Sequence, residues 1–403
     1  MVRPTVARID LGAIEANLRT LSSFLSRAAL GPRSATRDLR PAPPTPRPSA
    51  LAPRSIAVVK ANAYGHGSRE VGRALEHAGA AMLACADIEE GVTLRDAGVR
   101  IPILVFGALG ISDLDGVFGC GLTPTISTPT AARALQAAAR SRGVVLNCHL
   151  KIDTGMNRLG FRYDNLRRSL PDVAASSNLA IDTVYTHFAT ADEPESEAFS
   201  QQRERFDQAC ATLSSVGMHS RFRHAANSAG LLRDERVWYD FVRPGLLLYG
   251  IVPPPLAATL PLRPALSLHS RIVHVKGLRP GEGTGYGLAT VVDRPSTIAI
   301  VPAGYADGLD RRLAGRGHML VRGRRAPIVG SVCMDMTMID VTGMQVSPGD
   351  EVVIIGDQGD ESIGVREMAA AIGTIPYELL CRVGTRIERV YESRNSPNRP
   401  LTR

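Results

Sequence analysis

The chain has 403 residues, of which 44% are hydrophobic and 21% are charged. This length is typical of two or three domains, and the composition allows a large buried core, which excludes a small peptide and a disordered protein. The net charge is +8, but most of it falls in residues 31–54 and 391–403, so the nearly neutral remainder argues against a nucleic-acid-binding face.

The sequence indicates neither export nor a metal site. No stretch approaches the roughly 20 apolar residues that span a bilayer, and the first ten residues lack an apolar signal segment. We therefore expect a cytoplasmic protein with no membrane partner. The six cysteines are scattered, without a C-x-x-C pair or a histidine at the spacing of a zinc ligand, so reduced thiols and no bound metal are expected.

The first part of the chain alternates β-branched runs with helical patterns. A helix precedes residues 31–54, which contain seven prolines and predict a disordered insertion. In one later helix Ser127 or Thr128 can cap, Pro129 suits the first turn, and Gly143 stops it. The runs predicted as strands are 56–60, 81–86, 101–106, 122–127, 144–153, 180–188, 221–228 and 238–245.

Eight strand-helix units over about 200 residues predict an α/β fold with an N-terminal (β/α)8 TIM-like barrel. A Rossmann sheet is disfavoured, because its glycine fingerprint is missing from the first strand-to-helix turn. We assign residues 12–253 to the barrel, and residues 254–390 together with 1–11 to a C-terminal, mostly-β domain. The glycine-rich residues 281–287 precede no helix and are interpreted as a loop, and residues 391–403 as a flexible tail.

Lysine is rare in this chain: Lys60, Lys151 and Lys276 are the only three among 47 basic residues. A retained lysine is a candidate for chemistry that a guanidinium cannot perform, such as forming a Schiff base or acting as a base. In a barrel the working residues lie at the C-terminal strand ends, which here carry Lys60, Lys151, Arg158, His187, Asn227, Ser228 and Arg243. Such a set suits an anionic cofactor with a carbonyl group.

Nine segments carry a family resemblance: AVVKANAYGHG (57–67), KIDTGMNRLG (151–160), YTHFATAD (185–192), HAANSAG (224–230), VRPGLLLYG (242–250), GTGYG (283–287), VPAGYADG (301–308), GSVCMDM (330–336) and PYELLCRVGTR (376–386). In this order, and over residues 2 to about 390, the chain resembles alanine racemase. That family consists of pyridoxal 5'-phosphate enzymes with an N-terminal barrel and a C-terminal β domain. The resemblance therefore implies an isomerase that interconverts L- and D-alanine and supplies D-alanine for peptidoglycan.

The resemblance implies a two-base mechanism. Lys60 corresponds to the lysine that carries the cofactor and serves one face of the substrate Cα, and Tyr286 to the acid/base on the other face. A free tyrosine has a pKa near 10, so its neighbours must favour the phenolate, and the family supplies a chain through His187 to Arg243. Arg243 is expected to face the pyridine nitrogen of the cofactor.

The remaining roles are also implied by the family. Residues expected to hold the cofactor, besides Lys60, are Tyr64, His187, Asn227, Ser228, Arg243, Gly245, Leu246 and Tyr377. Arg158 and Met334 are expected at the substrate, and Lys151 corresponds to a lysine that is carbamylated in relatives. His224, Tyr305 and Asp335 are expected to support the site. Because the family takes Tyr286, Tyr305, Met334 and Asp335 from the partner subunit, a homodimer is expected.

Other functions remain open at this point. A racemase of broader substrate range shares most of these motifs, although such enzymes tend to be exported. A decarboxylase with the same two-domain plan fits less well, because HAANSAG and GYADG match it poorly. A non-enzymatic pyridoxal-phosphate protein usually lacks the second domain. A class I aldolase barrel explains a lysine at a strand end but not Tyr286.

Overall fold

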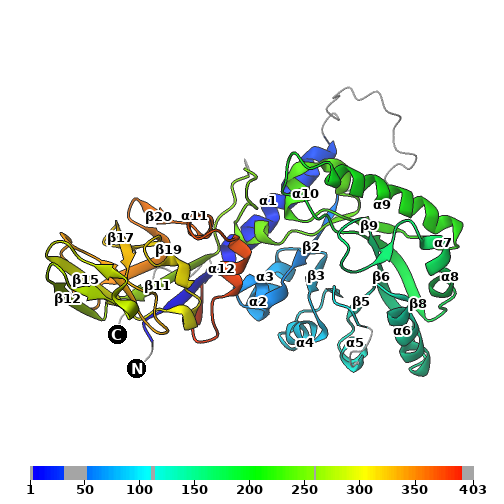
Figure 1. Ribbon diagram of the computed structural model, residues 1–403. Coiled ribbons are helices and arrows are strands. Elements are labelled where there is room, and N and C mark those ends of the chain that lie inside the picture. Colours follow the sequence, from blue (N-terminus) through cyan, green and yellow to red (C-terminus); the bar gives the residue numbers. More distant parts are fainter. Residues whose placement is uncertain (1–2, 31–51, 110–113, 258–259, 393–403) are drawn as a thin grey trace.

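The computed structural model describes residues 3–30, 52–109, 114–257 and 260–392. Two parts lie side by side, a barrel of strands surrounded by helices and a domain built mainly of strands (Figure 1). No helix in the described ranges is long and apolar enough to cross a bilayer.

Eight parallel strands form the barrel, and pairing of β5 with β6 and of β10 with β2 closes it. The prediction of a TIM-like barrel is confirmed, since each run predicted as a strand overlaps one of the eight. In spatial order they are β2 (Arg54–Val58), β3 (Met82–Cys85), β4 (Ile103–Val105), β5 (Thr123–Ile126), β6 (Leu146–Asp153), β8 (Leu179–Tyr185), β9 (Phe222–His224) and β10 (Phe241–Val242). The short β7 (Phe161–Arg162) pairs with β6 outside this ring.

Helices surround the barrel (Figure 1). As predicted, Thr128 caps α6 by accepting from Ala131 N at 3.1 Å, Pro129 begins the helix, and Gly143 follows it with φ 66°. The helices of this layer are α1 (Leu11–Leu30), α2 (Lys60–Tyr64), α3 (Ser68–His77), α4 (Ile88–Asp96), α5 (Asp115–Gly119), α6 (Pro129–Ser141), α7 (Leu166–Ser169), α8 (Pro171–Ala174), α9 (Ala198–Ser215), α10 (Ser228–Arg233), η1 (Glu235–Val237) and η2 (Leu246–Tyr249). Helix α1 packs against α3 and η2, between the last and first strands of the ring.

The second domain is a long, mostly antiparallel sheet, and the prediction of a mostly-β domain is confirmed. Its main path is β12 (His274–Leu278), β15 (Ser296–Val301), β18 (Thr337–Asp340), β17 (Arg324–Val329), β16 (His318–Val321), β19 (Glu351–Gln358), β11 (Leu266–Arg271), β1 (Val6–Asp10) and β21 (Glu388–Glu392). Strand β20 (Glu361–Ile363) pairs with β19. Strand β1 pairs with β11 and, in parallel, with β21, so the first strand of the chain lies in the sheet of the second domain.

Short helical elements complete the second domain. They are α11 (Val365–Ala371), α12 (Pro376–Cys381), η3 (Tyr286–Leu288), η4 (Tyr305–Asp307) and η5 (Arg311–Leu313). Helix α12 lies against α2 of the barrel, and a Cβ added at Gly65 would lie 2.1 Å from the carbonyl oxygen of Leu380. The barrel and the second domain therefore meet closely behind Lys60.

Some boundaries differ from the predictions. Strand β2 begins at Arg54, the last residue of the predicted insertion, and most of that insertion lies outside the described residues. Strand β21 reaches Glu392 because it pairs with β1 up to Asp10, so two residues of the predicted tail are in the sheet and the rest of the tail is not described. The glycine-rich segment forms a small hairpin of β13 (Gly283–Thr284) and β14 (Thr290–Val291) instead of a plain loop.

Candidate active site

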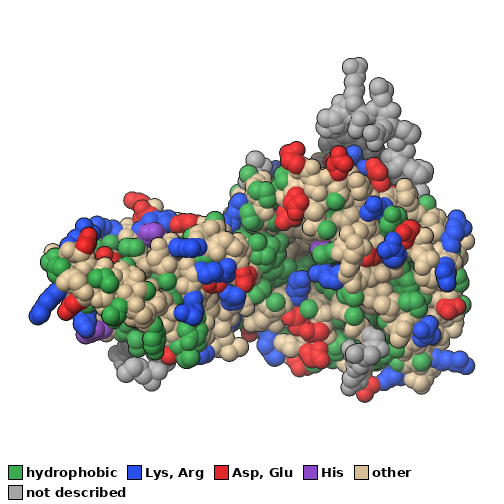
Figure 2. All heavy atoms as spheres, viewed as in Figure 1, with side chains coloured by type: hydrophobic (Ala, Val, Ile, Leu, Met, Phe, Trp, Pro, Cys, Tyr) green, Lys and Arg blue, Asp and Glu red, His purple; other side chains and the backbone are tan. Residues whose placement is uncertain are grey.

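The predicted barrel residues lie at its C-terminal end. Lys60 follows β2, Lys151 lies near the end of β6, and His187 follows β8. Ser228 begins α10 and Arg243 follows β10 directly. Figure 2 shows this part of the molecule hollowed, with hydrophobic side chains around the hollow and histidine and basic side chains near it. The strands thus bring together residues far apart in the sequence, as a barrel requires.

Lys60 precedes a strained segment of backbone. Residues 61–64 all have positive φ, between 52° and 53°, although none is glycine. A left-handed conformation costs an L-residue roughly 1–2 kcal/mol, so neighbouring contacts must hold it. Glu90 accepts from Ala61 N at 2.6 Å and from Ala86 N at 2.8 Å, and Asn62 Oδ1 accepts from Ser68 N at 2.8 Å. These contacts hold the backbone directly after Lys60 and thereby fix the position of its side chain at the end of the barrel.

Arg243 is a buried cation held by neutral acceptors. It is 2% exposed, and its Nη2 donates to the carbonyl oxygens of Thr186 and Ala225, both at 2.8 Å. It also contacts Nδ1 of His224 at 2.7 Å and Nδ1 of His187 at 3.2 Å. Burial lowers its pKa to about 10. None of these four partners carries a negative charge, so the positive charge of Arg243 is not cancelled by them.

The arginine also sets the protonation of the histidines. A guanidinium has only donors, so Nδ1 of His224 and of His187 must be unprotonated acceptors, and each neutral ring carries its proton on Nε2. Nε2 of His224 lies 3.0 Å from Nδ1 of His149, to which it donates. Burial first, and Arg243 second, lower the pKa of all three rings, to about 3 for His149 and well below the usual value for the other two. All three are neutral at physiological pH.

The mouth of the barrel carries four basic side chains without an acidic partner. Within the described ranges Lys60, Lys151, Arg158 and Arg243 form no ion pair with a carboxylate, whereas many surface arginines do. Burial and the charges of Arg243 and Arg158 lower the pKa of Lys151 to about 8, and burial and Arg158 lower that of Lys60. Two amines with a lowered pKa, in a group of basic side chains that form no ion pair with a carboxylate in the described ranges, fit an anionic ligand that reacts with an amine.

Hydroxyl groups and one glycine form a cradle beside these cations. Ser228 Oγ accepts from Gly245 N at 2.8 Å, and the Tyr64 ring lies 5.9 Å from that of Tyr377 on α12. A Cβ at Gly245 would lie 2.6 Å from the Tyr64 hydroxyl, so only glycine allows this approach. Leu246 follows at the start of η2, and Asn227 caps α10 by accepting from Gly230 N at 2.8 Å. Hydroxyl donors of this kind fit the phosphate of pyridoxal phosphate.

Four of the expected residues do not join this cluster within one chain. Tyr286 lies in η3 and is 78% exposed, Tyr305 is 43% exposed and Met334 is 51% exposed. In the part of the chain that is described, their hydrogen bonds, and the ion pair of Asp335, connect them to other residues of the second domain. A single chain therefore presents Lys60 and Tyr286 on separate surfaces.

Sequence reasoning missed His149 and Glu90. His149 lies two residues before Lys151 on β6, so both side chains face the barrel interior, and this spacing was the available signal. Glu90 lies on α4, and nothing in its local sequence indicates that it binds the backbone after Lys60. Across the described ranges, no group of three or more His, Cys, Asp or Glu side chains could hold a metal ion.

Comparison with protein families gives two matches that together cover most of the chain. Residues 48–253 match the family model described as alanine racemase, N-terminal domain. Residues 265–391 match the model described as alanine racemase, C-terminal domain.

Individual relatives agree with these matches over the whole length. The alanine racemase of Symbiobacterium thermophilum is 40% identical, covering 97% of each chain, and that of Halothermothrix orenii is 38% identical, covering 98% of each. Among solved structures, alanine racemase from Streptomyces lavendulae has a TM-score of 0.87 at 33% identity, covering 97% of this chain and 98% of that one. The Bacillus anthracis alanine racemase with bound L-Ala-P has a TM-score of 0.85 at 33% identity, covering 98% and 97%.

Proposed function

The chain belongs to the alanine racemase family of isomerases, and from this premise we propose that it racemises alanine with pyridoxal 5'-phosphate through two bases, Lys60 and Tyr286. In the organism this reaction would supply D-alanine for peptidoglycan. The observation that carries the proposal is the cluster of four basic side chains without acidic partners at the barrel mouth, which includes an amine, Lys60, whose pKa is lowered.

The residues present fit the cofactor. Lys60 supplies the amine for covalent attachment, and Tyr64, Ser228 and Tyr377 supply hydroxyl donors for the phosphate, while Gly245 leaves the space beside the Tyr64 hydroxyl free of a side chain. When bound, pyridoxal phosphate supplies an electron-accepting ring that makes the substrate Cα–H more acidic. Arg243 has only donors, so next to a ring nitrogen it would hydrogen-bond without taking up a proton.

The two proton-transfer groups approach the substrate from different chains in this proposal. Lys60 holds or releases a proton on one face of Cα, and Tyr286 of the partner subunit does so on the other. The Nε2–H of His187, fixed by the Arg243 contact to Nδ1, is available to stabilise a phenolate. Arg158 would bind the substrate carboxylate. The pKa of Lys151, about 8, leaves a larger fraction of reactive neutral amine than an ordinary lysine has, and a carbamate on it would add a negative charge that holds Arg158.

Exposed apolar side chains of the second domain support a homodimer. Six large side chains on neighbouring segments are between 43% and 78% exposed: Tyr286, Leu288, Val291, Tyr305, Met334 and Met336. Single exposed apolar residues are ordinary, but a group of this size is typical of an interaction surface. A second copy of the chain would cover the group and bring Tyr286 to the barrel mouth.

The test follows the optical rotation of L-alanine with the purified protein and pyridoxal phosphate. We expect rotation to decay to zero with all alanine recovered, and to persist in Lys60→Ala and Tyr286→Phe. Lys276→Ala, which changes an exposed lysine on β12, is the matched control and should behave as the wild type. Unchanged rotation with the wild type would contradict the proposal, and release of carbon dioxide from another amino acid would indicate a decarboxylase.

A further inference from the structure

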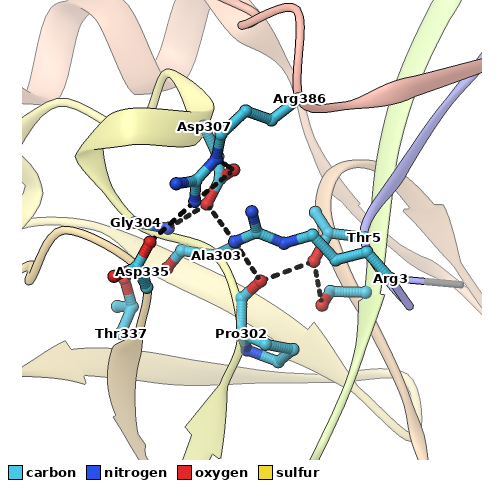
Figure 3. A network of polar contacts seen from close by, with 10 residues as sticks. Arg3, Thr5, Pro302, Ala303, Gly304, Asp307, Asp335, Thr337 and Arg386 are labelled. Atoms are coloured by element: carbon cyan, nitrogen blue, oxygen red, sulfur yellow. Dashed lines mark hydrogen bonds and ion pairs between the residues drawn. The ribbon is translucent and has the colours of Figure 1, made fainter. Parts of the chain in front are cut away.

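The second domain buries one carboxylate completely. Asp307 is 0% exposed, and each of its oxygens has two donors. Oδ2 accepts from Arg3 Nη2 at 2.7 Å and from Gly304 N at 2.9 Å, and Oδ1 accepts from Nε and Nη2 of Arg386, both at 3.1 Å. Figure 3 shows the two arginines reaching Asp307 from different sides. A buried carboxylate with four donors and two cationic partners is fully satisfied, so its position is well defined.

This carboxylate lies beneath the turn that presents Tyr305. The turn η4 spans Tyr305–Asp307 and is attached to the segment before β18 by two backbone bonds, Tyr305 N to Cys333 O at 2.9 Å and Ala306 N to Met334 O at 3.1 Å. A Cβ at Gly304 would lie 2.3 Å from both of these carbonyl oxygens. The Tyr305 turn and the Met334 segment therefore touch backbone to backbone.

Arg386 connects the same two segments through side chains. Besides Asp307, its Nη2 donates to Asp335 Oδ1 at 2.8 Å, next to Met334 in sequence. In Figure 3 the guanidinium of Arg386 lies between Asp307 and Asp335, so this one planar group binds both carboxylates. A guanidinium can bind two carboxylates in fixed directions, which an ammonium cannot do.

We propose that Arg386 is a positioning residue, which holds the Tyr305 turn and the Met334 segment as one rigid surface where the second domain meets the partner's active site. The inference rests on the proposed function, because it assumes that Tyr305 and Met334 approach a substrate across the dimer interface. Arg386 itself touches neither substrate nor cofactor. Its role is to reduce the motion of the exposed Tyr305 and Met334, whose segments it ties together through Asp307 and Asp335.

The first test measures this motion without relying on activity. The holoenzyme is labelled with methyl-13C methionine, and the methyl order parameters are compared between the wild type, Arg386→Gln and Arg386→Lys. We expect the order parameter of Met334 to fall in both variants, and less in the lysine variant, which keeps the charge. The methyl group of Met319, which is 0% exposed in the same domain, should not change. An unchanged Met334 signal in a folded Arg386→Gln protein would overturn the proposal.

The second test separates positioning from stability. In Arg386→Gln we expect KM for L-alanine to rise about tenfold with kcat within about twofold, and sedimentation to show an intact dimer. Arg325→Gln is the control, because Arg325 also binds two acidic residues, Glu361 and Glu367, but in another part of the sheet. It should lose less thermal stability, because its partners are exposed, and leave KM unchanged. If both variants lose only stability, Arg386 has no positioning role.

Failure of the proposed function and failure of the inference about Arg386 give different results. If the wild-type protein does not racemise alanine, the proposed function is wrong, whereas the methionine measurement still decides whether Arg386 rigidifies the two segments. If Arg386→Gln does not fold, the conservative Arg386→Lys variant decides the matter by the same comparison of Met334 with Met319. A lysine variant identical to the wild type in Met334 order and in KM would contradict the proposal.

Discussion

Arg243 in the barrel and Asp307 in the second domain are both buried charges, but their surroundings are opposite. Arg243 is 2% exposed and contacts two carbonyl oxygens and two neutral histidines, none of which carries a negative charge. Asp307 is 0% exposed and contacts two arginines. The barrel charge is solvated by dipoles, whereas the charge of Asp307 is neutralised by ion pairs.

The difference indicates what each charge is for. A cation without a counter-ion keeps a positive potential at the barrel mouth, where an anionic cofactor and a carboxylate substrate would supply the missing negative charge. A carboxylate with two arginines attracts no further ligand, and its remaining effect is to connect the segments that its partners belong to.

The largest effect on stability is expected for Asp307→Ala. Removing one partner of a buried ion pair costs about 3–5 kcal/mol, and here we expect about 3 kcal/mol because Arg3 and Arg386 can reach solvent. Asp164→Ala is the matched control, since its ion pair with Arg162 is exposed and its loss should barely change the free energy of unfolding. Urea unfolding measures both values, and equal losses would contradict the buried role of Asp307.

An intermediate effect is expected for Arg243→Lys. The charge is kept, but three ammonium donors cannot reproduce the fork that reaches four acceptors, which should cost about 2 kcal/mol. Racemisation should fall at least about tenfold, because the histidine contact is lost. Arg205→Lys, on α9, removes a guanidinium with one hydrogen bond to Thr154 O and should stay within about twofold of wild-type activity. If both variants retain activity equally, the Arg243 contacts do not matter for the reaction.

A smaller effect is expected in the pH dependence of stability, which should differ between the barrel and the second domain. Burial lowers the pKa of His149 to about 3, so the unfolded chain binds a proton below about pH 6.5 that the folded chain does not. The stability contributed by the neutral ring is complete above that pH and is lost as the pH falls, by about 1.4 kcal/mol per pH unit. Urea unfolding at pH 7 and pH 5 should show a shallower slope in His149→Gln.

The control for this slope is a substitution of an exposed histidine, His219→Gln, which should leave the slope of stability against pH as in the wild type. In the second domain, hydrogen bonds from Arg312 lower the pKa of Asp310, and that contribution to stability is lost only at a much lower pH than the histidine contribution. Acid between pH 6.5 and 4 should therefore weaken the barrel first. A wild-type stability that does not change between pH 7 and 5 would contradict neutral buried histidines.

Local patterns in the sequence were sufficient to predict the barrel strands and the positions of many barrel residues at their ends. The alternation of apolar runs and capped helices predicted all eight barrel strands, and strand ends predicted where Lys60, Lys151 and Arg243 lie. The contacts between His149, His224 and Arg243 could not be predicted, because they depend on how β6, β9 and β10 align once the barrel closes. The pairing of β1 with β21 has the same cause, since it joins the two ends of the chain. In the proposed dimer, the place of Tyr286 and Met334 in the site depends on a second chain, which no local pattern describes.

The central claim is that Lys60 and Tyr286 of different subunits form one site, and mixing two inactive variants tests it most directly. Lys60→Ala and Tyr286→Phe are co-expressed with different tags, and racemisation of L-alanine is measured on the hybrid dimers and on each variant alone. In random mixing half of the dimers are hybrids, and each hybrid has one intact site of two, so the mixture should regain about one quarter of wild-type activity. A mixture as inactive as its components would contradict the account, because both residues would then have to come from the same chain.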